Sequence, residues 1–549
     1  MKKLLQIVIA VALCTIGTNA MAQMSYGGEP YSFKHTMSMS IPTIDIEALD
    51  AEALLAEDAT IEGKNHALRI GVTKDVLYTI DNSGRMDYMP DGSKVWRIAF
   101  HMEDATFTSM NFSTFNIPEG AELYLYTPDR EYVIGKFTNK NLMEDGTFYP
   151  QEMPGEDIVV EYYEPAGVAF HGDLVIDQIS QGYYDFFHIN EREEKGGIGN
   201  AEGTCHPNAI CQDANWHDQI NSVVCYTMTS GGYIYMCSGA MVNNTARDGK
   251  QYLLSANHCY EGGTWKFYFN YQATTCTGTN GTILHTATGY TLKAKDDGSS
   301  SSDFMLIEIT GTINPSYNAF LAGWDNSATQ TQSLNAATSC GAIHHPGGDT
   351  KKFSTPQTLR NGALVYSNTT KFWITTWATA TGATEQGSSG SPLFNKDKLI
   401  IGQLYAGSSS CDTPSGEDLY GKLSNSWTNS NNSSNAKKLK PWLDPTNSGA
   451  TTIQGEYLST VGMTNFTQVV NALNVYPNPS NGLISVSGSF DEGVGICNVY
   501  DMMGNLVMSQ NINLVSEFTL NLSQLVSGMY MVEINDNSNI YRSKIIISK

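Results

Sequence analysis

The sequence is poor in charged residues, and positive charge is the scarcer sign. Asp, Glu, Lys and Arg make up 16% of the 549 residues, and 32 Lys plus Arg face 55 Asp plus Glu for a formal net charge of -23. Such a chain repels phosphate backbones and anionic lipid headgroups, so nucleic acid is not expected as a partner. Long amphipathic helices are scarce too, whereas Gly, Ser, Thr and Asn are abundant, which is typical of an all-β protein with many turns.

Long apolar runs are missing except near the amino terminus. There Lys2 and Lys3 precede an apolar run from Leu4 to Ile16, and Ala20-Met21-Ala22 follows. This pattern is typical of a secretion signal, and we expect residues 1–22 to be removed after Ala22. The run is too short to cross a bilayer, so no stable membrane span is expected.

Cysteine is absent from residues 23–195, which carry strand-like runs such as Trp96 to Phe100 between turn signals. We expect a β-rich module there that ends in an exposed, cleavable charged stretch, residues 191–197. Residues 196–457 hold eight of the ten cysteines and form the next expected domain. A polar linker, residues 458–472, leads to a small module of short β runs, residues 473–549.

Two segments of the cysteine-rich domain supply a base and a group to orient it, as acyl transfer from an amide requires. His258 follows the apolar run Tyr252 to Ala256 and precedes Cys259, which can pin its loop. Asp303 stands at the mouth of the apolar run Phe304 to Ile309, where it can be desolvated enough to orient an imidazole. An isolated His or Asp is usually structural, and Asp296 and Asp297 are rivals to Asp303.

A third segment, Glu385 to Phe394, supplies a serine and backbone amides. Small residues surround Ser389, so the backbone can turn tightly and present N–H groups to an oxyanion. Ser-Gly runs are common in flexible loops, but strand-like runs, Phe372 to Trp377 and Leu399 to Leu404, flank this one. The order His, Asp, Ser along the chain is that of the chymotrypsin-like families.

Residues from about 200 to 450 resemble the lysyl endopeptidases secreted by Achromobacter and Lysobacter. Beyond the three segments, the resemblance extends to Gly239 to Thr245, Phe269 to Gln272, Ala322 to Asp325, Ile343 to Pro346, Gly402 to Leu404 and Pro441 to Pro445. It implies an all-β chymotrypsin-like double β-barrel with the catalytic triad His258, Asp303 and Ser389 in the cleft between the barrels. It makes Ser389, rather than Ser388 or Ser391, the nucleophile, and the N–H groups of Gly387 and Ser389 the oxyanion hole.

The resemblance also implies a substrate pocket. Asp418 matches the carboxylate that holds a lysine side chain, which predicts cleavage after Lys, although Glu417 and Asp412 are close neighbours. Tyr405 and Gly407 line the pocket. Tyr405 replaces the His of the family and Tyr366 replaces the Trp that stacks on that His, so acceptance of Arg stays open. A glutamyl-type or broad-specificity serine protease is the alternative within the class.

The family pattern implies the disulfides Cys205–Cys411, Cys211–Cys276 and Cys237–Cys259, and it leaves Cys225 and Cys340 as a candidate fourth pair. Ser388 stands where many chymotrypsin relatives carry the Asp that pairs with a newly freed amino terminus. We therefore expect activation by removal of residues 23–195 as a propeptide, with self-cleavage at Lys195-Gly196, and no insertion of an amine.

The last module resembles the carboxy-terminal sorting domain of the type IX secretion system of Bacteroidetes, on its opening Val475 to Gly482 and its closing Gly528 to Ile534 and Lys544 to Lys549. A small β-sandwich is implied. The expected partners are protein or peptide substrates and the secretion machinery, and the expected product is an extracellular monomer, exported through the periplasm and either free or attached to the cell surface.

Two other classes of function stay open. One is an inactive, adhesin-like binding protein that has kept the protease fold. The other is a metallohydrolase, suggested by His344-His345, but adjacent strand residues point to opposite faces and no third ligand stands at helical spacing. We expect neither a cofactor nor a metal.

Overall fold

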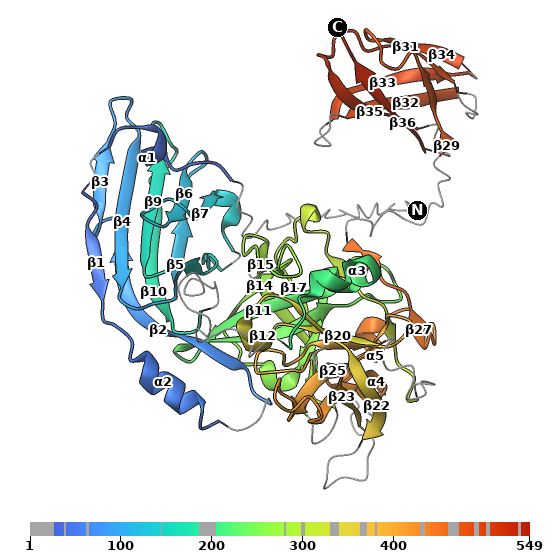
Figure 1. Ribbon diagram of the computed structural model, residues 1–549. Coiled ribbons are helices and arrows are strands. Elements are labelled where there is room, and N and C mark those ends of the chain that lie inside the picture. The colour runs from blue at the N-terminus through green and yellow to red at the C-terminus, as the bar shows by residue number, and fades with distance from the viewer. Residues whose placement is uncertain are drawn as a thin grey trace, which may run out of the picture. The chain divides into compact units, whose positions relative to one another are not determined.

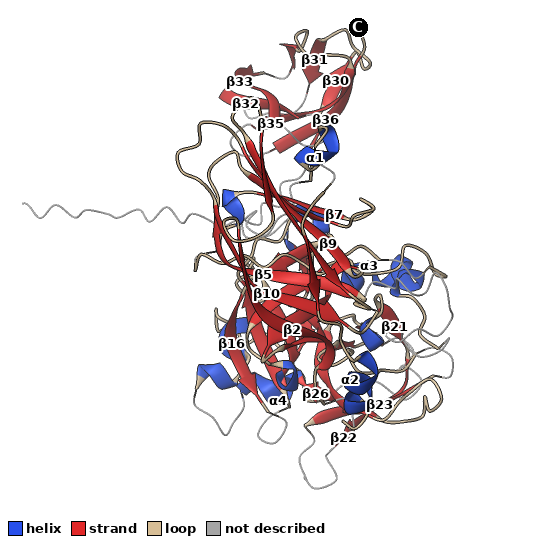
Figure 2. Cartoon of the chain, turned by 90° about the vertical axis from the view of Figure 1, so that its left-hand side faces the viewer, coloured by secondary structure: helices blue, strands red, loops and turns tan. Residues whose placement is uncertain are grey.

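A computed structural model describes residues 27–37, 40–61, 65–143, 145–185, 205–278, 281–297, 302–329, 340–362, 371–378, 382–428, 434–458, 471–487, 493–500, 506–515, 517–535 and 540–549. The predicted signal peptide, the Lys195-Gly196 bond and Tyr366 lie outside these ranges. The chain divides into two compact units, Met1–Val461 and Gly462–Lys549. Strands dominate the described parts and the helices are short (Figures 1 and 2), so the all-β prediction is confirmed.

The amino-terminal part of the first unit is a sandwich of two sheets around one apolar core. One layer has the order β1-β4-β9-β6-β7, with β3 beside β4, and the other has the order β2-β10-β5-β8. Large side chains from both layers, such as Trp96, Phe100, Phe112 and Phe115, fill the space between them. The elements are β1 (Thr43–Ile46), β2 (Leu68–Thr79), β3 (Arg85–Tyr88), β4 (Lys94–Met102), β5 (Phe107–Asn116), β6 (Glu122–Tyr126), β7 (Val133–Phe137), β8 (Met153–Pro154), β9 (Asp157–Glu164), β10 (Asp173–Gly182), α1 (Tyr31–Lys34), α2 (Ala51–Asp58) and the 3-10 turn η1 (Asn139–Asn141).

The first half of the cysteine-rich domain is a curved antiparallel sheet with the order β15-β14-β11-β12-β13-β17-β16. Strand β2 of the amino-terminal sandwich pairs with β12, so the two parts share one 11-stranded sheet among the described residues (Figure 1). The elements are β11 (Val223–Ser230), β12 (Tyr233–Met241), β13 (Tyr252–Ala256), β14 (Thr264–Tyr268), β15 (Thr286–Thr288), β16 (Tyr290–Asp296), β17 (Phe304–Ile309), α3 (Asp213–Ser222), η3 (Ala209–Gln212), η4 (Asn257–Cys259) and η5 (Pro315–Tyr317).

The second half is a sheet with the order β21-β20-β24-β25-β26-β23-β22, and β19 and β27 extend it at β25. Leu254 and Phe304 from the first half pack with Ile343 and Ile400 from the second in one apolar cluster, so the two halves share a core. The elements are β18 (Phe320–Leu321), β19 (Trp324–Asp325), β20 (Gly341–His344), β21 (Lys352–Ser354), β22 (Pro356–Gly362), β23 (Phe372–Trp377), β24 (Pro392–Phe394), β25 (Ile400–Gly407), β26 (Asp418–Lys422), β27 (Thr452–Ile453), β28 (Glu456–Tyr457), α4 (Leu423–Thr428), α5 (Lys440–Leu443), η7 (Pro346–Gly348) and η8 (Asn435–Lys437).

The second unit is a small sandwich of two sheets, with the orders β29-β36-β35-β32-β33 and β30-β31-β34. Its apolar core contains Cys497, a free cysteine whose burial raises the thiol pKa to about 12. The strands are β29 (Asn471–Ala472), β30 (Asn474–Tyr476), β31 (Leu483–Ser487), β32 (Gly493–Tyr500), β33 (Leu506–Leu514), β34 (Glu517–Asn521), β35 (Gly528–Asn535) and β36 (Ile540–Ile547).

None of the helices within the described ranges combines the length and the apolar character needed to cross a membrane.

Candidate active site

His258 and Asp303 meet because their strands are paired. Strand β13 lies antiparallel to β17 with Ala256 opposite Phe304, so the residues just beyond these two, His258 and Asp303, become neighbours. His258 Nδ1 lies 2.6 Å from Asp303 Oδ2, and the His258 backbone N–H donates to Asp303 Oδ1 at 3.1 Å. Because a carboxylate only accepts, Nδ1 carries the proton and Nε2 is left to act as a base.

Asp303 is held in a costly position. It is 2% exposed, and burial raises the pKa of its carboxyl group against the lowering effect of His258. Its φ of 57° lies in the left-handed region, which costs a residue other than glycine roughly 1–2 kcal/mol. The rival Asp296 instead accepts a hydrogen bond from Lys437 Nζ at 3.3 Å.

Ser389 lies against the strands that carry His258. Its carbonyl oxygen accepts the backbone N–H of Ser238 in β12 at 2.9 Å, and its side chain is fully buried. The next residue, Gly390, approaches β13 so closely that a Cβ there would lie 1.9 Å from Ser255 Oγ and 2.8 Å from the nitrogen of Ala256. His258 Nε2 is buried and has no hydrogen-bond partner among the described residues.

Two polar residues that support the site were not predicted as site residues from the sequence. Gln403 Nε2 donates to the carbonyl oxygens of Ser302 at 2.7 Å and Asp303 at 3.2 Å, and so ties β25 to the Asp303 turn. Ser238 Oγ donates to the carbonyl oxygen of Gly387 at 2.8 Å. Both residue types are common in loops and strands, so only the contacts reveal their part in the site.

Asp418 is completely buried at the start of β26. Its Oδ2 accepts hydrogen bonds from Trp377 Nε1 at 2.7 Å, from Thr384 Oγ1 at 2.6 Å and from Ser409 Oγ at 2.6 Å. A Cβ on the neighbouring Gly407 would lie 1.8 Å from Asp418 Oδ1, so only glycine fits there. The predicted pocket residues Asp418 and Gly407 are therefore in contact.

Tyr405 lies beside His258. Its ring stands edge-on to His258 at 6.2 Å between centroids and stacks on Phe372 at 5.0 Å. The resemblance implied a stacking partner at residue 366, which the structure does not describe. Phe372 is thus an aromatic neighbour of Tyr405 that the sequence analysis did not identify.

The structure contains the disulfides Cys205–Cys411, Cys211–Cys276 and Cys237–Cys259, the three pairs that the resemblance implied. The candidate bridge between Cys225 and Cys340 is wrong, because Cys225 is a free cysteine. Cys225 is buried in an apolar cluster with Ile234, Met236 and Tyr268, and burial raises its thiol pKa well above the usual range.

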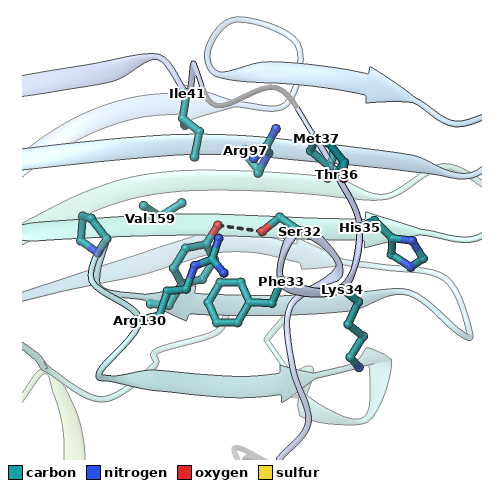
Figure 3. A pocket seen from close by; sticks show the side chains of 12 residues that line it. Ser32, Phe33, Lys34, His35, Thr36, Met37, Ile41, Arg97, Arg130 and Val159 are labelled. Atoms are coloured by element: carbon teal, nitrogen blue, oxygen red, sulfur yellow. Dashed lines mark hydrogen bonds between the residues drawn. The ribbon is translucent and has the colours of Figure 1, made fainter.

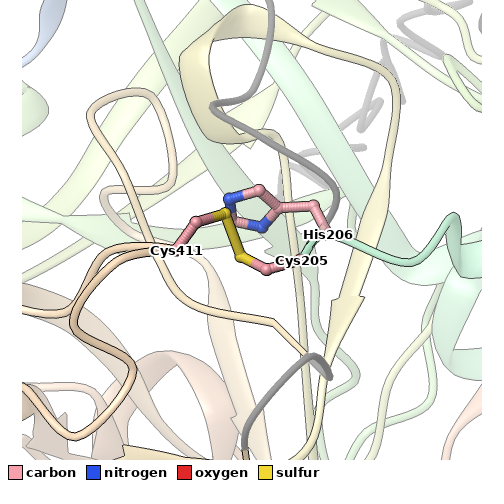
Figure 4. A group of neighbouring side chains, drawn as sticks. All are labelled: Cys205, His206 and Cys411. Atoms are coloured by element: carbon pink, nitrogen blue, oxygen red, sulfur yellow. A yellow bond between two sulfur atoms is a disulfide. The ribbon is translucent and has the colours of Figure 1, made fainter.

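The adjacent residues His344 and His345 do not act together. His344 bonds Ser388 and Ser354, while His345 Nδ1 donates to the carbonyl oxygen of Asp349 at 3.0 Å and its ring stacks on Tyr271. Cys205, His206 and Cys411 have ligand atoms within 4.8 Å of one another, but the two cysteines are joined to each other (Figure 4).

A pocket of about 560 Å³ lies in the amino-terminal sandwich, where α1 meets β4 and β9 (Figure 3). Ser32, Arg97, Arg130 and Val159 are among the residues that line it. None of the predicted site residues lines this pocket, so it plays no part in the candidate active site.

The cysteine-rich domain is similar to known proteins. Residues 199–421 match the family model of the lysyl endopeptidase C-terminal domain, and the region is also similar to solved structures of the chymotrypsin-like protease fold. Two of these are the protease Anisep from Arthrobacter nicotinovorans (17% identity, TM-score 0.28, 37% of this chain and 90% of that chain) and a Glu endopeptidase (16% identity, TM-score 0.25, 40% of this chain and 92% of that chain). The family model thus makes residues 199–421 similar to a domain of secreted proteases.

The chain is similar to the lysyl endopeptidase of Pseudomonas aeruginosa, at 27% identity over 320 residues. The match covers 55% of this chain and 65% of that protein, so the chain spans less than two thirds of its relative. Residues 474–548 match the family model of the secretion system C-terminal sorting domain, which implies secretion across the outer membrane.

Proposed function

We propose that this protein is a secreted serine endopeptidase that hydrolyses peptide bonds through an acyl-enzyme. The contact that carries the proposal is the 2.6 Å bond between His258 Nδ1 and a buried Asp303, because it leaves Nε2 to act as a base beside the Ser389 loop. A merely structural histidine would not need a strained, buried carboxylate to orient it.

The proposed reaction follows from these positions. Ser389 Oγ attacks the carbonyl carbon while His258 Nε2 takes its proton, and Asp303 stabilises the imidazolium that forms. The N–H groups of Gly387 and Ser389 hold the oxyanion. His258 then gives the proton to the leaving amine, the C–N bond breaks, and water releases the acyl group by the same route.

Fluorophosphonate labelling tests the proposal. The matured protein should take up one probe per chain at Ser389, and Ser389→Ala should take up none. Ser391→Ala is the matched control, since Ser391 is a buried serine of the same loop, and it should still be labelled. A wild-type protein that folds but does not react would point to a binding protein that has kept only the protease fold.

We propose that the enzyme prefers Lys before the scissile bond and that Asp418 sets this preference. Burial of the Asp418 carboxylate supports it, because a desolvated carboxylate favours a cationic side chain over a neutral one of equal size. Because Tyr405 replaces the His of the family, the proposal leaves open whether the enzyme also cleaves after Arg.

Cleavage-site mapping by mass spectrometry tests this preference. Digestion of a protein of known sequence should give cuts after Lys, and Asp418→Asn should lower kcat/KM for Lys substrates by about 30-fold or more. Glu417→Gln is the control, because Glu417 is an exposed neighbour. Cuts after Glu or after large apolar residues in the wild type would move the protein to another specificity class.

We also propose that residues 23–195 keep the enzyme latent. Strand β2 pairs with β12, and Leu68 lies opposite Met236. The residue after Met236, Cys237, forms a disulfide with Cys259, which is the neighbour of His258. Leu68 Cδ2 lies 3.4 Å from where a Cβ on Gly387 would stand, and His66 Nε2 lies 3.2 Å from Gln386 Nε2. The segment from His66 to Leu68 thus lies where a substrate chain would meet the Ser389 loop.

Buried polar contacts also join residues 23–195 to the cysteine-rich domain. Lys266 Nζ in β14 donates to Glu152 Oε1 at 3.1 Å and to Ser109 Oγ at 2.9 Å, and both charged side chains are at most 2% exposed. Separation therefore exposes a buried charge pair to water, and cleavage of the connecting chain is the expected first step.

A processing-resistant variant tests latency. Lys195→Ala should remain a single uncleaved chain that hydrolyses peptides much more slowly than the wild type, since β2 stays in place. Lys140→Ala, which changes an exposed lysine of the same segment, should mature normally. Full activity in uncleaved Lys195→Ala would contradict the proposal.

Finally, we propose that residues 473–549 direct the chain to a type IX secretion system of a Bacteroidetes bacterium, after a signal peptide has taken it into the periplasm. The sorting-domain match supports this route. Deletion of residues 473–549 should leave the protease inside the outer membrane, as fractionation of a host with this system would show.

A further inference from the structure

His206 and Glu385 form a buried contact outside the triad. His206 Nε2 lies 2.6 Å from Glu385 Oε1, and the side chains are 1% and 12% exposed. His206 is fixed beside the Cys205–Cys411 disulfide (Figure 4), and its Nδ1 is buried without a hydrogen-bond partner among the described residues. Because a carboxylate only accepts, Nε2–H donates to Glu385.

Glu385 in turn fixes the turn before the nucleophile. Its backbone carbonyl accepts the N–H of Ser388 at 3.1 Å, and its own N–H donates to Ser388 Oγ at 3.1 Å. Gly387 and Ser389 flank Ser388 on either side. A shift of Glu385 would therefore move both amides that the proposed oxyanion hole needs.

Ser388 is anchored a second time through His344. Ser354 Oγ donates to the carbonyl oxygen of Ala383 at 2.9 Å, so its oxygen accepts from His344 Nε2–H at 2.8 Å. That leaves His344 Nδ1 as an acceptor, and Ser388 Oγ–H donates to it at 2.8 Å. Ser354, His344 and Ser388 are all fully buried, and the rings of His206 and His344 lie 6.1 Å apart.

We propose that Glu385 and His206 are a positioning pair. Together with the His344–Ser388 hydrogen bond, this pair shapes the oxyanion loop. Related enzymes shape that loop with an Asp before the nucleophile and a freed amino terminus. The anchor is then built into the folded chain and does not depend on a new amine. This inference rests on the proposed serine protease function and adds two residues to it.

The test separates transition-state from ground-state binding. The probes are a peptide boronic acid, which forms a tetrahedral adduct with serine, and the matching peptide carboxylate, both built on a sequence that the enzyme cleaves. In protein expressed from the full chain and matured, Glu385→Ala should lower kcat and boronate affinity together by about 10- to 100-fold, with KM and carboxylate affinity nearly unchanged.

Conservative and double variants sharpen the test. Glu385→Gln should recover most of the loss, because its amide oxygen can still accept from His206 Nε2–H. His206→Ala should match Glu385→Ala, and the double variant should lose no more than either alone. Asp213→Ala is the matched control, since it breaks an exposed His–carboxylate contact, 2.7 Å to His217, far along the chain from the loop.

Two results would overturn the inference. One is a fall in thermal stability with an unchanged ratio of boronate to carboxylate affinity, which would make the pair merely structural. The other is full additivity of the two single losses. Should Glu385→Ala fail to fold, the ratio of boronate to carboxylate affinity in His206→Ala decides. A wild-type enzyme that does not react with fluorophosphonate would instead refute the proposed function.

Discussion

The two halves of the candidate site are held by different means. His258 and Asp303 stand at the ends of two directly paired strands, β13 and β17, and a disulfide to β12 closes the turn at Cys259. The loop with Ser389 is held instead by side-chain contacts, including Ser238 to Gly387, His344 to Ser388 and Glu385 to His206. Backbone pairing thus positions the proposed base, whereas a buried polar network holds the loop of the proposed nucleophile.

The largest expected effect shows whether these halves act as one unit. Ser389→Ala and His258→Ala lie in different halves, yet each should lower kcat by on the order of 10⁶-fold, because neither residue works without the other. The double variant should be no worse than either single one. Hydrolysis of a peptide substrate at saturating concentration measures this, and multiplying losses would show that the halves act independently.

Asp303→Asn probes the half that is built by paired strands. The amide should preserve the packing but hold His258 in the wrong tautomer, and kcat should fall by about 10⁴-fold. Asp296→Asn provides the control, because Asp296 bonds Lys437 and should leave kcat unchanged. Equal losses of kcat in the two variants would make Asp296 a candidate again for the carboxylate that orients His258.

The Cys237–Cys259 disulfide should matter for stability as well as for geometry. It closes a loop of 22 residues, and replacing both cysteines with Ala should lower the free energy of unfolding by about 3 kcal/mol. Denaturant unfolding in a Ser389→Ala background, which prevents self-digestion, gives the value. Removal of Cys211–Cys276 should cost a similar amount but leave kcat unchanged, since that bridge does not touch the His258 turn.

The sequence predicted the strand-built half better than the network-built half. An apolar run that ends in His258 and another that begins after Asp303 are visible in the chain, and the pairing of β13 with β17 follows from them. The side-chain contacts of Gln403, Ser238 and Glu385 join residues a hundred or more positions apart, and polar residues of these types are common throughout the chain. No local pattern distinguishes the few that are buried and bonded.

The pairing of β2 with β12 also went unforeseen. Composition and the absence of cysteine predict that residues 23–195 form a module of their own. Strand β2 has an ordinary alternating pattern, and nothing in that pattern shows that its partners come from two different parts of the chain. The pairing Cys225–Cys340 was wrong for a related reason, since counting leftover cysteines ignores where they are buried.

The last expected effect is a pH dependence of stability that belongs to the network-built half. His345 is fully buried between Tyr271 and a region containing Lys351 and Lys352, and burial lowers its pKa to about 3 from an ordinary 6.5. The unfolded chain takes up a proton near pH 6.5 whereas the folded protein resists until about pH 3. The stability that neutral His345 contributes is therefore complete above pH 6.5 and is lost as the pH falls toward 3.

This loss should amount to at most about 1.4 kcal/mol per pH unit. Replacing His345 with Phe should cost stability at pH 7, because the bond to Asp349 is lost, but the difference from the parent should shrink as the pH falls to 4. Urea unfolding at several pH values in the Ser389→Ala background measures it, with the exposed His217→Phe as control. A constant difference would mean that His345 is protonated in the folded protein and that the network tolerates charge.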